Sequence, residues 1–431
     1  MGGWLLPGLH VKRWLVLLGL GFITMGFGLG LVAFLPHGVG WWRAGVLTGV
    51  GGLAAIAVGA GGTLRSLSRA FNVPQSSMAE WLMTRQRAAR GPKVVALGGG
   101  TGLPTLLRGL KTCTSNITAI VTVADDGGSS GRLRGSLGVL PPGDVRNCLV
   151  ALADAEPQMR DLFQYRFEEG ELSGHSFGNL FIAAMERTAG DFVSALGALS
   201  RVLAVRGAVF PVTLDSVALV AELEDGTRVE GESQIGHSQA PIRRVWLEPQ
   251  MATPLVAALR AIEDADLIVI GPGSLYTSVI PNLLVAEVTD AIVGSAAPVV
   301  YVANVMTQPG ETASYTAFDH LAALERHSRK GLVDVMVVNT ERVPAEVLDR
   351  YRADGAEVVR VGQDEDRRAR PRVRVVEERL LMPDTVVRHD PQKLAHAVLS
   401  VLFSGNSEWV KRHPFDSWAL HERIRLQGRM R

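Results

Sequence analysis

Two long uncharged segments lie near the start of the chain. Residues Trp14 to Leu35 and Ala44 to Leu64 contain no charged side chain. Each is close to the roughly 20 apolar residues that a helix needs to cross the hydrocarbon core of a bilayer. The short loop Pro36 to Arg43 between them carries Trp41 and Trp42, and tryptophan is typical of the membrane–water interface. The pattern predicts a transmembrane hairpin.

Flanking charges predict how this hairpin is oriented. Lys12 and Arg13 precede the first segment, five arginines follow the second between residues 65 and 90, and Arg43 alone lies in the turn. Basic residues favour the cytoplasmic side, so both ends are expected inside the cell. A cleaved signal peptide and a buried soluble hairpin are the competing interpretations, and the second long segment argues against both. Gly26-x3-Gly30 and Gly45-x3-Gly49 predict close contact between the helices.

The pattern changes after residues 66–92, a basic connector that ends in Gly91-Pro92. Short apolar runs then alternate with helical patterns, which favours a parallel sheet covered on both faces. Thr253-Pro254 is expected to begin one of the helices. Between 212 and 233, alternating residues around Asp225-Gly226 predict a β-hairpin. The expected strands are 94–97, 117–124, 267–270, 299–305 and 333–338.

The predicted fold class is therefore α/β: a doubly wound, mostly parallel, Rossmann-like sheet with a β-hairpin insertion, preceded by the two-helix transmembrane hairpin. The expected parts are the hairpin (1–65), the connector (66–92), an α/β ligand-binding domain (93–403) and a basic C-terminal tail (404–431). Two interpretations of the tail stay open. Its basic side chains and tryptophans could lie against anionic lipid headgroups. Equally, the tail could form a helix that faces solvent or a partner.

The candidate ligand site begins where the first strand ends. Residues 94–97 run into a glycine-rich turn, and an amphipathic helical pattern follows at once. Glycine lets the backbone approach a ligand closely, and the first amides of the helix would face an anion. The predicted phosphate contacts are Gly99, Gly100, Thr101 and Gly102. The spacing matches neither the dinucleotide fingerprint nor the P-loop, so a structural turn competes with this hypothesis. Replacing Gly100 by valine is expected to weaken binding without unfolding the domain.

Further polar loops follow the other expected strands. Asp125 and Asp126 suit sugar hydroxyls or a Mg²⁺ ion that accompanies a diphosphate, and they also suit capping of the turn. Asp144 is expected to cap a helix. Tyr276 either stacks on a base or fills the core, and His175 is a binding candidate, not a catalytic base. The remaining candidate ligand contacts are Asn147, Asn179, Gly273, Ser274 and Asn304.

Composition restricts the function only a little. The chain of 431 residues is too long for one ordinary domain. Its 44 basic and 43 acidic residues give a net charge of +1, which indicates no nucleic-acid partner. Cys113 and Cys148 are far apart and form no Cys-x-x-Cys pair, which argues against zinc and disulfides and fits a reducing compartment.

Six motifs occur in a fixed order between Lys93 and Phe403. They are Gly98-Gly-Gly-Thr-Gly, Asp125-Asp-Gly-Gly-Ser-Ser-Gly-Arg-Leu, Pro142-Gly-Asp-Val-Arg-Asn, His175-Ser-Phe-Gly-Asn-Leu, Gly271-Pro-Gly-Ser-Leu-Tyr-Thr-Ser and Asn304-Val-Met-Thr-Gln-Pro-Gly-Glu-Thr. This ordered set resembles the gluconeogenesis factor family (YvcK-like), which is related to the 2-phospho-lactate transferase (CofD) family. The resemblance implies a doubly wound nucleotide-binding fold over most of the body of the chain.

The resemblance also implies a ligand and a role. The ligand would be a UDP-sugar, UDP-N-acetylglucosamine, and the role would be support of cell shape and cell-wall synthesis on gluconeogenic carbon sources. The expected partners are cell-wall synthesis proteins and a second copy of the chain. The implied ligand contacts are the loop 99–102, Asp125, Asp126, Asn147, His175, Asn179, Ser274 and Tyr276. Members of the family are typically cytoplasmic, so the hairpin is a departure that implies anchoring to the cell membrane.

Two functional hypotheses remain open at this point. The first is a membrane-tethered UDP-sugar sensor, because the chain has binding loops without an obvious nucleophile. The second is a magnesium-dependent transferase of a phospho-acid or sugar phosphate, because of the related transferase and the pair Asp125 and Asp126. The binding hypothesis is favoured, and an oxidoreductase ranks third.

Overall fold

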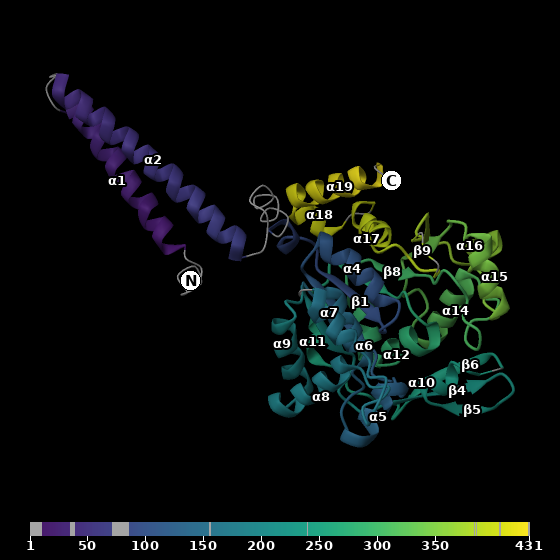
Figure 1. The fold of residues 1–431 in the computed structure, drawn as a ribbon. Helices are drawn as coiled ribbons and strands as arrows, with labels where there is room; N and C mark the ends of the chain where they lie inside the picture. The colour runs from purple at the N-terminus through teal and green to yellow at the C-terminus, as the bar shows by residue number, and fades with distance from the viewer. Residues whose placement is uncertain are drawn as a thin grey trace. The chain divides into compact units, whose positions relative to one another are not determined.

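The computed structural model describes residues 11–34, 39–70, 86–154, 157–238, 240–382, 384, 386–404 and 407–429. The chain divides into two compact units, Met1–Gln86 and Arg87–Arg431, and each is described by itself. The first unit consists of two long helices, α1 (Lys12–Phe34) and α2 (Val39–Ala70) (Figure 1). Its linker to the second unit, from 71 to 85, lies outside the described residues.

Both helices of the first unit are long and apolar enough to cross a membrane. Mean hydropathy is 2.2 over Lys12–Ala33 and 1.7 over Gly40–Ser66. Large apolar side chains such as Leu20 and Leu47 are exposed, as is typical of a surface that faces lipid. The helix α2 begins at Val39, so Trp41 and Trp42 lie on its first turn and not in a loop as predicted.

Glycine allows α1 and α2 to pack closely. A Cβ atom at Gly28 would lie 2.5 Å from the Gly49 amide nitrogen, and one at Gly52 would lie 2.5 Å from the Met25 amide nitrogen. The predicted contact is present at Gly45, whose Cβ atom would lie 2.6 Å from the Val32 side chain, and at Gly49 through its backbone, although the Cβ position of Gly49 is itself open. The prediction for Gly26 and Gly30 is wrong, because no atom lies within 4 Å of either Cβ position. Helical rotation places those two glycines on an open face.

The second unit contains a seven-stranded parallel sheet in the order β10-β9-β8-β7-β1-β2-β3. The strands are β1 (Val94–Gly98), β2 (Ile117–Val121), β3 (Ala208–Pro211), β7 (Leu267–Ile270), β8 (Val299–Val302), β9 (Val335–Asn339) and β10 (Arg374–Glu378). The chain builds outward from β1 to β3, returns to the other side of β1 and then builds outward to β10. The strand order therefore reverses between β1 and β7, which is where ligands bind in open α/β sheets.

Helices cover both faces of the sheet, as the alternation of its apolar side chains requires. Val94 and Ala96 point into one core, and Val95 and Leu97 point into the other. The first core contains α4 (Leu103–Cys113), α6 (Gly143–Leu152), α9 (Phe192–Val202) and α17 (Pro391–Ser400). The second contains α11 (Val256–Glu263), α12 (Ile280–Leu283), α13 (Ala286–Gly294) and α14 (Ala317–His327). The predicted doubly wound α/β fold is confirmed.

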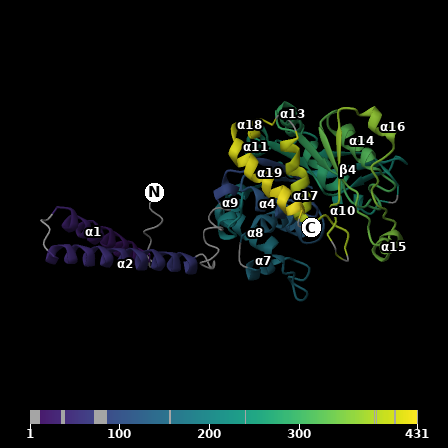
Figure 2. The same cartoon turned by 90° about the horizontal axis from the view of Figure 1, so that it is seen from above.

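The remaining helices lie around this body. They are α5 (Gly128–Leu137), α7 (Pro157–Gln164), α8 (Phe177–Ala189), α10 (Glu232–Ile235), α15 (Ala345–Ala353), α16 (Asp364–Ala369), α18 (Glu408–Arg412) and α19 (Pro414–Arg429), with a short π-helix at Leu275–Val279 and a 3-10 turn at Val401–Phe403. Figure 2 shows α17, α18 and α19 together at the surface of the second unit. Trp409 and Leu420 are buried in the core that contains α4, so the helices of the predicted tail segment pack on the body.

The predicted hairpin insertion is present and has a third strand. Strands β5 (Arg228–Glu230), β4 (Ala218–Leu223) and β6 (Ile242–Glu248) form an antiparallel sheet in this order. Leu219 and Ala221 face the core, as their alternation predicts. The predicted start of a helix at Thr253-Pro254 is wrong: α11 begins at Val256, because Pro254 pairs in an isolated bridge with Thr213 and stays extended.

Candidate functional site

Three loops meet at the carboxyl edge of the sheet, where the strand order reverses. A Cβ atom on Gly102, after β1, would collide with the carbonyl oxygen of Pro272 and lie 2.8 Å from the Gly273 amide nitrogen, after β7. The Asn304 side chain, after β8, accepts a hydrogen bond from the Gly273 amide at 3.2 Å and donates one to its carbonyl at 2.9 Å. Gly271 has φ of +78°, a conformation that favours glycine. The three loops are therefore fixed against one another.

These loops surround a cavity of about 330 Å³, named here the switch-point cavity. Five predicted site residues line it together: Thr101, Gly102, Gly273, Ser274 and Asn304. The hydroxyl of Ser274 accepts a hydrogen bond from the Gln308 amide at 2.8 Å. Val305, Met306 and Tyr351 add apolar surface. Apolar walls with a few fixed polar groups are typical of a small-molecule site.

The segment 386–389 forms another wall of the switch-point cavity, and sequence reasoning missed it. The Val387 amide donates a hydrogen bond to the Tyr351 hydroxyl at 3.1 Å, and Leu381 pairs with His389 in an antiparallel bridge. Tyr351 lies on α15 and Arg388 just before α17, so neither residue follows a predicted strand and neither has a motif around it. Only the pairing across the fold brings them to this edge.

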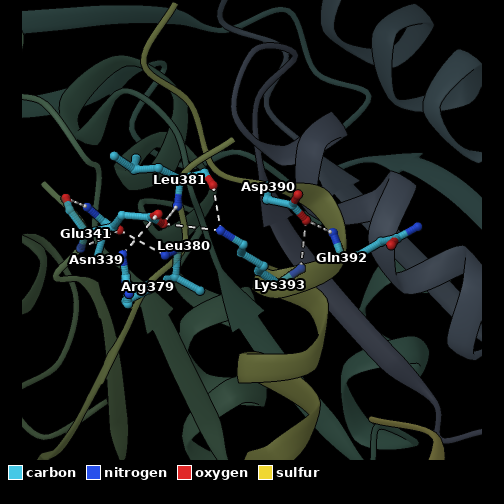
Figure 3. Close-up of polar contacts among 8 residues, drawn as sticks. All are labelled: Asn339, Glu341, Arg379, Leu380, Leu381, Asp390, Gln392 and Lys393. Carbon is cyan, nitrogen blue, oxygen red and sulfur yellow. Dashed lines mark hydrogen bonds and ion pairs between the residues drawn. The ribbon is translucent and has the colours of Figure 1, made fainter. Parts of the chain in front are cut away.

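Polar contacts on both sides of the segment fix its position (Figure 3). The Leu380 amide donates to Asn339 at 3.0 Å, and the Leu381 amide donates to Glu341 at 3.0 Å. Lys393, on the first turn of α17, donates to Glu341 at 3.2 Å and to the Leu381 carbonyl at 2.9 Å. The loop after β9 and the start of α17 therefore hold the neighbours of residues 386–389, which reduces the entropy cost of placing Arg388 at the cavity.

His389 lies at the same wall and is enclosed by protein. Its Nε2 atom has no hydrogen-bond partner within the described part of the chain. Burial lowers the pKa of His389 to about 4, because the charged imidazolium would lose its hydration without gaining a partner. The side chain is therefore neutral at physiological pH.

A second cavity of about 550 Å³ adjoins the first, and it is named here the cationic cavity. Thr101, Thr105 and Arg388 line both cavities. The predicted site residues Gly100 and Asn147 line the cationic cavity, together with basic side chains of α4 and α7. The structure thus divides the predicted site between two neighbouring hollows.

The glycines of the first loop pack against protein. A Cβ atom on Gly99 would lie 2.6 Å from the Ser278 hydroxyl, and one on Gly100 would collide with the Asp144 carboxylate. Valine at position 100 would therefore displace Asp144 and α6, so the expectation that this change leaves the fold intact is wrong. Glycine is required here for a close approach between parts of the same chain.

Asp144 lies against the first glycine loop, in a role that the sequence did not indicate. The predicted cap is wrong, because Pro142 holds the N-cap position of α6 and Asp144 lies inside its first turn. The Asp144 carboxylate instead accepts a hydrogen bond from the Gly100 amide. Burial and the neighbouring Asp125 raise the pKa of Asp144 to about 7. The first glycine loop therefore contacts a carboxyl group that is partly protonated near neutral pH.

The carboxylates of Asp125 and Asp126 have different partners. Asp125 accepts the Gly127 amide at 2.9 Å, and Asp126 accepts the Ser233 amide at 2.9 Å. Asp125 is also hydrogen-bonded to Glu232, whose pKa burial and Asp125 raise to about 9. Asp125 thus caps its own turn as expected, whereas Asp126 accepts a distant amide at the start of α10. Among the described residues, no group of three or more His, Cys, Asp or Glu side chains is arranged to hold a metal ion.

Three other predicted contacts lie away from both cavities. The His175 ring is 3.0 Å from the Ser129 hydroxyl, and burial lowers the pKa of His175. Asn179 is buried and accepts a hydrogen bond from Arg146 at 2.9 Å. Tyr276 is completely buried with its hydroxyl 2.9 Å from that of Tyr315, so its side chain fills the core, the second of the two alternatives.

Comparisons with known proteins agree with this architecture. The family model described as 2-phospho-L-lactate transferase CofD matches residues 94–381. A gluconeogenesis factor of Bacillus subtilis is 49% identical over 312 residues, which cover 72% of this chain and 98% of that protein. A crystal structure of a UPF0052 family member from Bacillus halodurans is 51% identical, with a TM-score of 0.69, and covers 72% of this chain and 99% of that chain.

The fold and the match from β1 to β10 define the class of the second unit, a doubly wound domain of the CofD type. The chain belongs to the gluconeogenesis factor family. A Nostoc sp. relative with gluconeogenesis factor in its name is 47% identical and matches 92% of this chain and 91% of its own length. A Clostridium acetobutylicum relative matches 98% of this chain and 96% of its own, so a segment before the body is not peculiar to this chain.

Proposed function

We propose that the second unit binds a UDP-sugar, UDP-N-acetylglucosamine, at the switch-point cavity. One observation carries the proposal: the loops after β1, β7 and β8 and the segment 386–389 surround a single hollow at the reversal of strand order. The adjacent start of α4 and the loop amides suit a diphosphate, because both direct positive partial charge toward an anion. Membership of the gluconeogenesis factor family supports a regulatory role of the ligand in cell shape and cell-wall synthesis.

In this proposal each wall of the cavity has its own part. Arg388 is exposed at the cavity and has no carboxylate within ion-pair distance in the described chain, so it is available to pair with the diphosphate. Tyr351, Val305 and Met306 supply the apolar surface for the base. Tyr351 thus takes the stacking part that sequence reasoning considered for Tyr276. Ser274 and Thr101 offer hydroxyl groups to the sugar.

Localisation belongs to the same proposal. The helices α1 and α2 would anchor the unit to the cell membrane with both ends of the chain inside, where UDP-sugars and cell-wall synthesis proteins are available. The same proposal includes a homo-oligomer. Extraction of the full chain by carbonate without detergent would contradict an anchor that spans the bilayer.

Calorimetric titration of the full chain in nonionic detergent micelles tests the ligand. UDP-N-acetylglucosamine should bind more tightly than UDP, GDP or NAD, and preference for NAD would reject the proposal. Tyr351→Ala should weaken binding by about tenfold, since stacking of a base on an aromatic ring contributes roughly 1–3 kcal/mol. Tyr351→Phe keeps the ring and removes the hydroxyl that accepts the Val387 amide, so it separates the stacking contribution from the contact that positions residues 386–389.

A second candidate function is transfer of a phospho-acid or sugar phosphate with Mg²⁺. Asp144 and Glu232 favour it, because burial raises the pKa of both carboxyl groups near the first glycine loop, which suits proton transfer or a metal brought by the ligand. Magnesium-dependent loss of the sugar nucleotide, abolished in Asp144→Asn, would establish it. An unchanged nucleotide after prolonged incubation with candidate acceptors would leave binding as the function.

A further inference from the structure

The cationic cavity collects basic side chains from three separate parts of the chain. Arg108 and Lys111 come from α4, Arg160 from α7 and Arg388 from the segment before α17. The cavity measures about 550 Å³, and Asn147, Gln164 and Thr105 add polar groups to its lining. Such a volume is large enough for a small phosphorylated molecule.

Three of these cations have no ion-pair partner among the described residues. In the described chain, Arg108, Arg160 and Arg388 have no carboxylate within ion-pair distance, whereas the nearby Arg206 pairs with Asp154 at 2.6 Å. Asp161 is the carboxylate among the described lining residues, and it forms no ion pair with them. Lys111 is held by the Ala153 carbonyl at 2.7 Å. The cavity therefore concentrates positive charge that the fold leaves uncompensated.

The arginines also act on one another electrostatically. Burial lowers the pKa of Arg108, and the positive charges of Arg388 and Arg160 lower it further. Like charges that repel one another destabilise the folded state unless an anion lies between them. Arginine donors in a fork suit phosphate oxygens in particular. The arrangement is therefore that of an anion site and not of a surface stabilised by ion pairs.

We propose that the cationic cavity is a second ligand site, which binds a small soluble molecule carrying a phosphomonoester or diphosphate group. This site is distinct from the proposed UDP-sugar site, because each cavity has lining residues that the other lacks. Arg160 and Gln164 line only this cavity, and Ser274 and Tyr351 line only the switch-point cavity. Arg388, Thr101 and Thr105 form the shared wall, so two ligands would lie side by side.

The full chain in nonionic detergent micelles, titrated with inorganic pyrophosphate, tests this site. Pyrophosphate should bind in the presence of saturating UDP-N-acetylglucosamine. Arg160→Gln should weaken pyrophosphate binding by about tenfold, as expected for the loss of one charged hydrogen-bond donor, and should change UDP-N-acetylglucosamine affinity by less than about threefold. Arg201→Gln is the matched control: Arg201 is exposed on α9 and lines neither cavity, so its loss should change neither affinity.

Each result decides between distinct accounts. Complete competition between the two ligands, with equal losses in Arg160→Gln, would show that the arginines bind the phosphates of the nucleotide itself and would overturn the second site. Pyrophosphate affinity that is unchanged in Arg160→Gln would also overturn it. Binding of pyrophosphate that depends on Arg160, in a chain that fails to bind UDP-N-acetylglucosamine, would reject the proposed function and leave this site standing.

A lipid headgroup offers the same phosphate chemistry, so the source is tested separately. The titration is repeated in nanodiscs of phosphatidylcholine and of phosphatidylglycerol. If the ligand is soluble, pyrophosphate should bind with equal affinity in both kinds of nanodisc. Any general effect of the lipid charge should appear equally in Arg201→Gln. Loss of pyrophosphate binding in phosphatidylglycerol nanodiscs, while binding is kept in phosphatidylcholine nanodiscs, would assign the cavity to a lipid headgroup and overturn the soluble ligand.

Discussion

The two edges of the parallel sheet in the second unit contain cavities of different character. The larger, about 760 Å³, lies at the amino edge, where Lys93, Asp266 and Asp334 stand at the starts of strands. Its charges are largely satisfied: Lys93 pairs with Asp264 at 3.1 Å, Arg412 pairs with Asp266 at 3.1 Å, and Asp334 accepts the Val299 amide at 2.8 Å.

The cavities at the carboxyl edge are smaller, yet Arg108, Arg160 and Arg388 there have no carboxylate partner among the described residues. Volume alone therefore does not identify a ligand site. Charge that the fold leaves uncompensated, next to glycine loops at the reversal of strand order, is the better indication. The amino edge is expected to serve stability and the carboxyl edge to serve binding.

The largest expected effect concerns His389, whose buried side chain belongs to the carboxyl edge. Its folded pKa of about 4 lies below the ordinary value of 6.5, so the folded state binds fewer protons than the unfolded chain between these two pH values. The stability it contributes is present above pH 6.5 and is lost as the pH falls toward 4, by at most about 3 kcal/mol. Thermal unfolding of the full chain in micelles across this range measures the loss, and His389→Gln should flatten it. Equal pH profiles would contradict the burial of an unpartnered imidazole.

A somewhat smaller effect is expected from Asp266→Ala at the amino edge. The Asp266 carboxylate is only 9% exposed, pairs with Arg412 and accepts the Lys93 amide at 2.9 Å. Its removal leaves a backbone donor and a cation without their partner, which costs about 2 kcal/mol of unfolding free energy. Urea unfolding measures this cost, while the affinity for UDP-N-acetylglucosamine should stay unchanged. A variant that loses affinity but keeps its stability would reverse the assignment of the two edges.

Arg388→Gln, at the carboxyl edge, should weaken ligand binding and leave the stability unchanged, the reverse of Asp266→Ala. Loss of its charge at the shared wall is expected to weaken UDP-N-acetylglucosamine binding by about tenfold, or roughly 1.4 kcal/mol. The unfolding free energy of the free protein should not fall, because repulsion with Arg108 is relieved. Calorimetric titration and urea unfolding of the same preparation give both quantities. Lower stability with normal affinity would indicate that Arg388 is a structural residue.

The smallest effect is expected from Lys93→Gln. The side chains of Lys93 and Asp264 are 57% and 72% exposed, and exposed ion pairs contribute about 0.5 kcal/mol or less. Urea unfolding should hardly distinguish this variant from the parent chain, and ligand affinity should not change. A loss above about 1 kcal/mol would show that the amino edge depends on its surface pairs more than their exposure indicates.

Much of the fold followed from local patterns. Runs such as Val94 to Leu97 and Leu267 to Ile270 predicted buried strands at the right places, because a strand covered on both faces must be apolar throughout. The loops after β1, β7 and β8 were found for the same reason: glycine and polar residues directly after such a run mark the carboxyl edge. The third strand of the insertion, β6, was missed because its mixture of charged and apolar residues gives a weak pattern.

Other parts of the site depended on contacts between distant residues. Tyr351 and Arg388 reach the cavity only because the segment 386–389 pairs back across the fold. Asp144 packs against Gly100 because α6 lies against the first loop. It is therefore buried against that loop and does not cap the helix as expected. Tyr276 lies in the core because the π-helix after β7 directs it inward.

By itself, the sequence determined the two long apolar helices, five of the seven strands of the parallel sheet and the loops after them, because hydrophobic periodicity and glycine content act over a few neighbouring residues. The two edge strands, β3 and β10, were missed. Only the tertiary structure decided which polar groups line a common cavity and which form hydrogen bonds or ion pairs with other groups of the protein. Burial and the pairing of charge depend on neighbours that lie hundreds of residues away along the chain, and no local pattern records them.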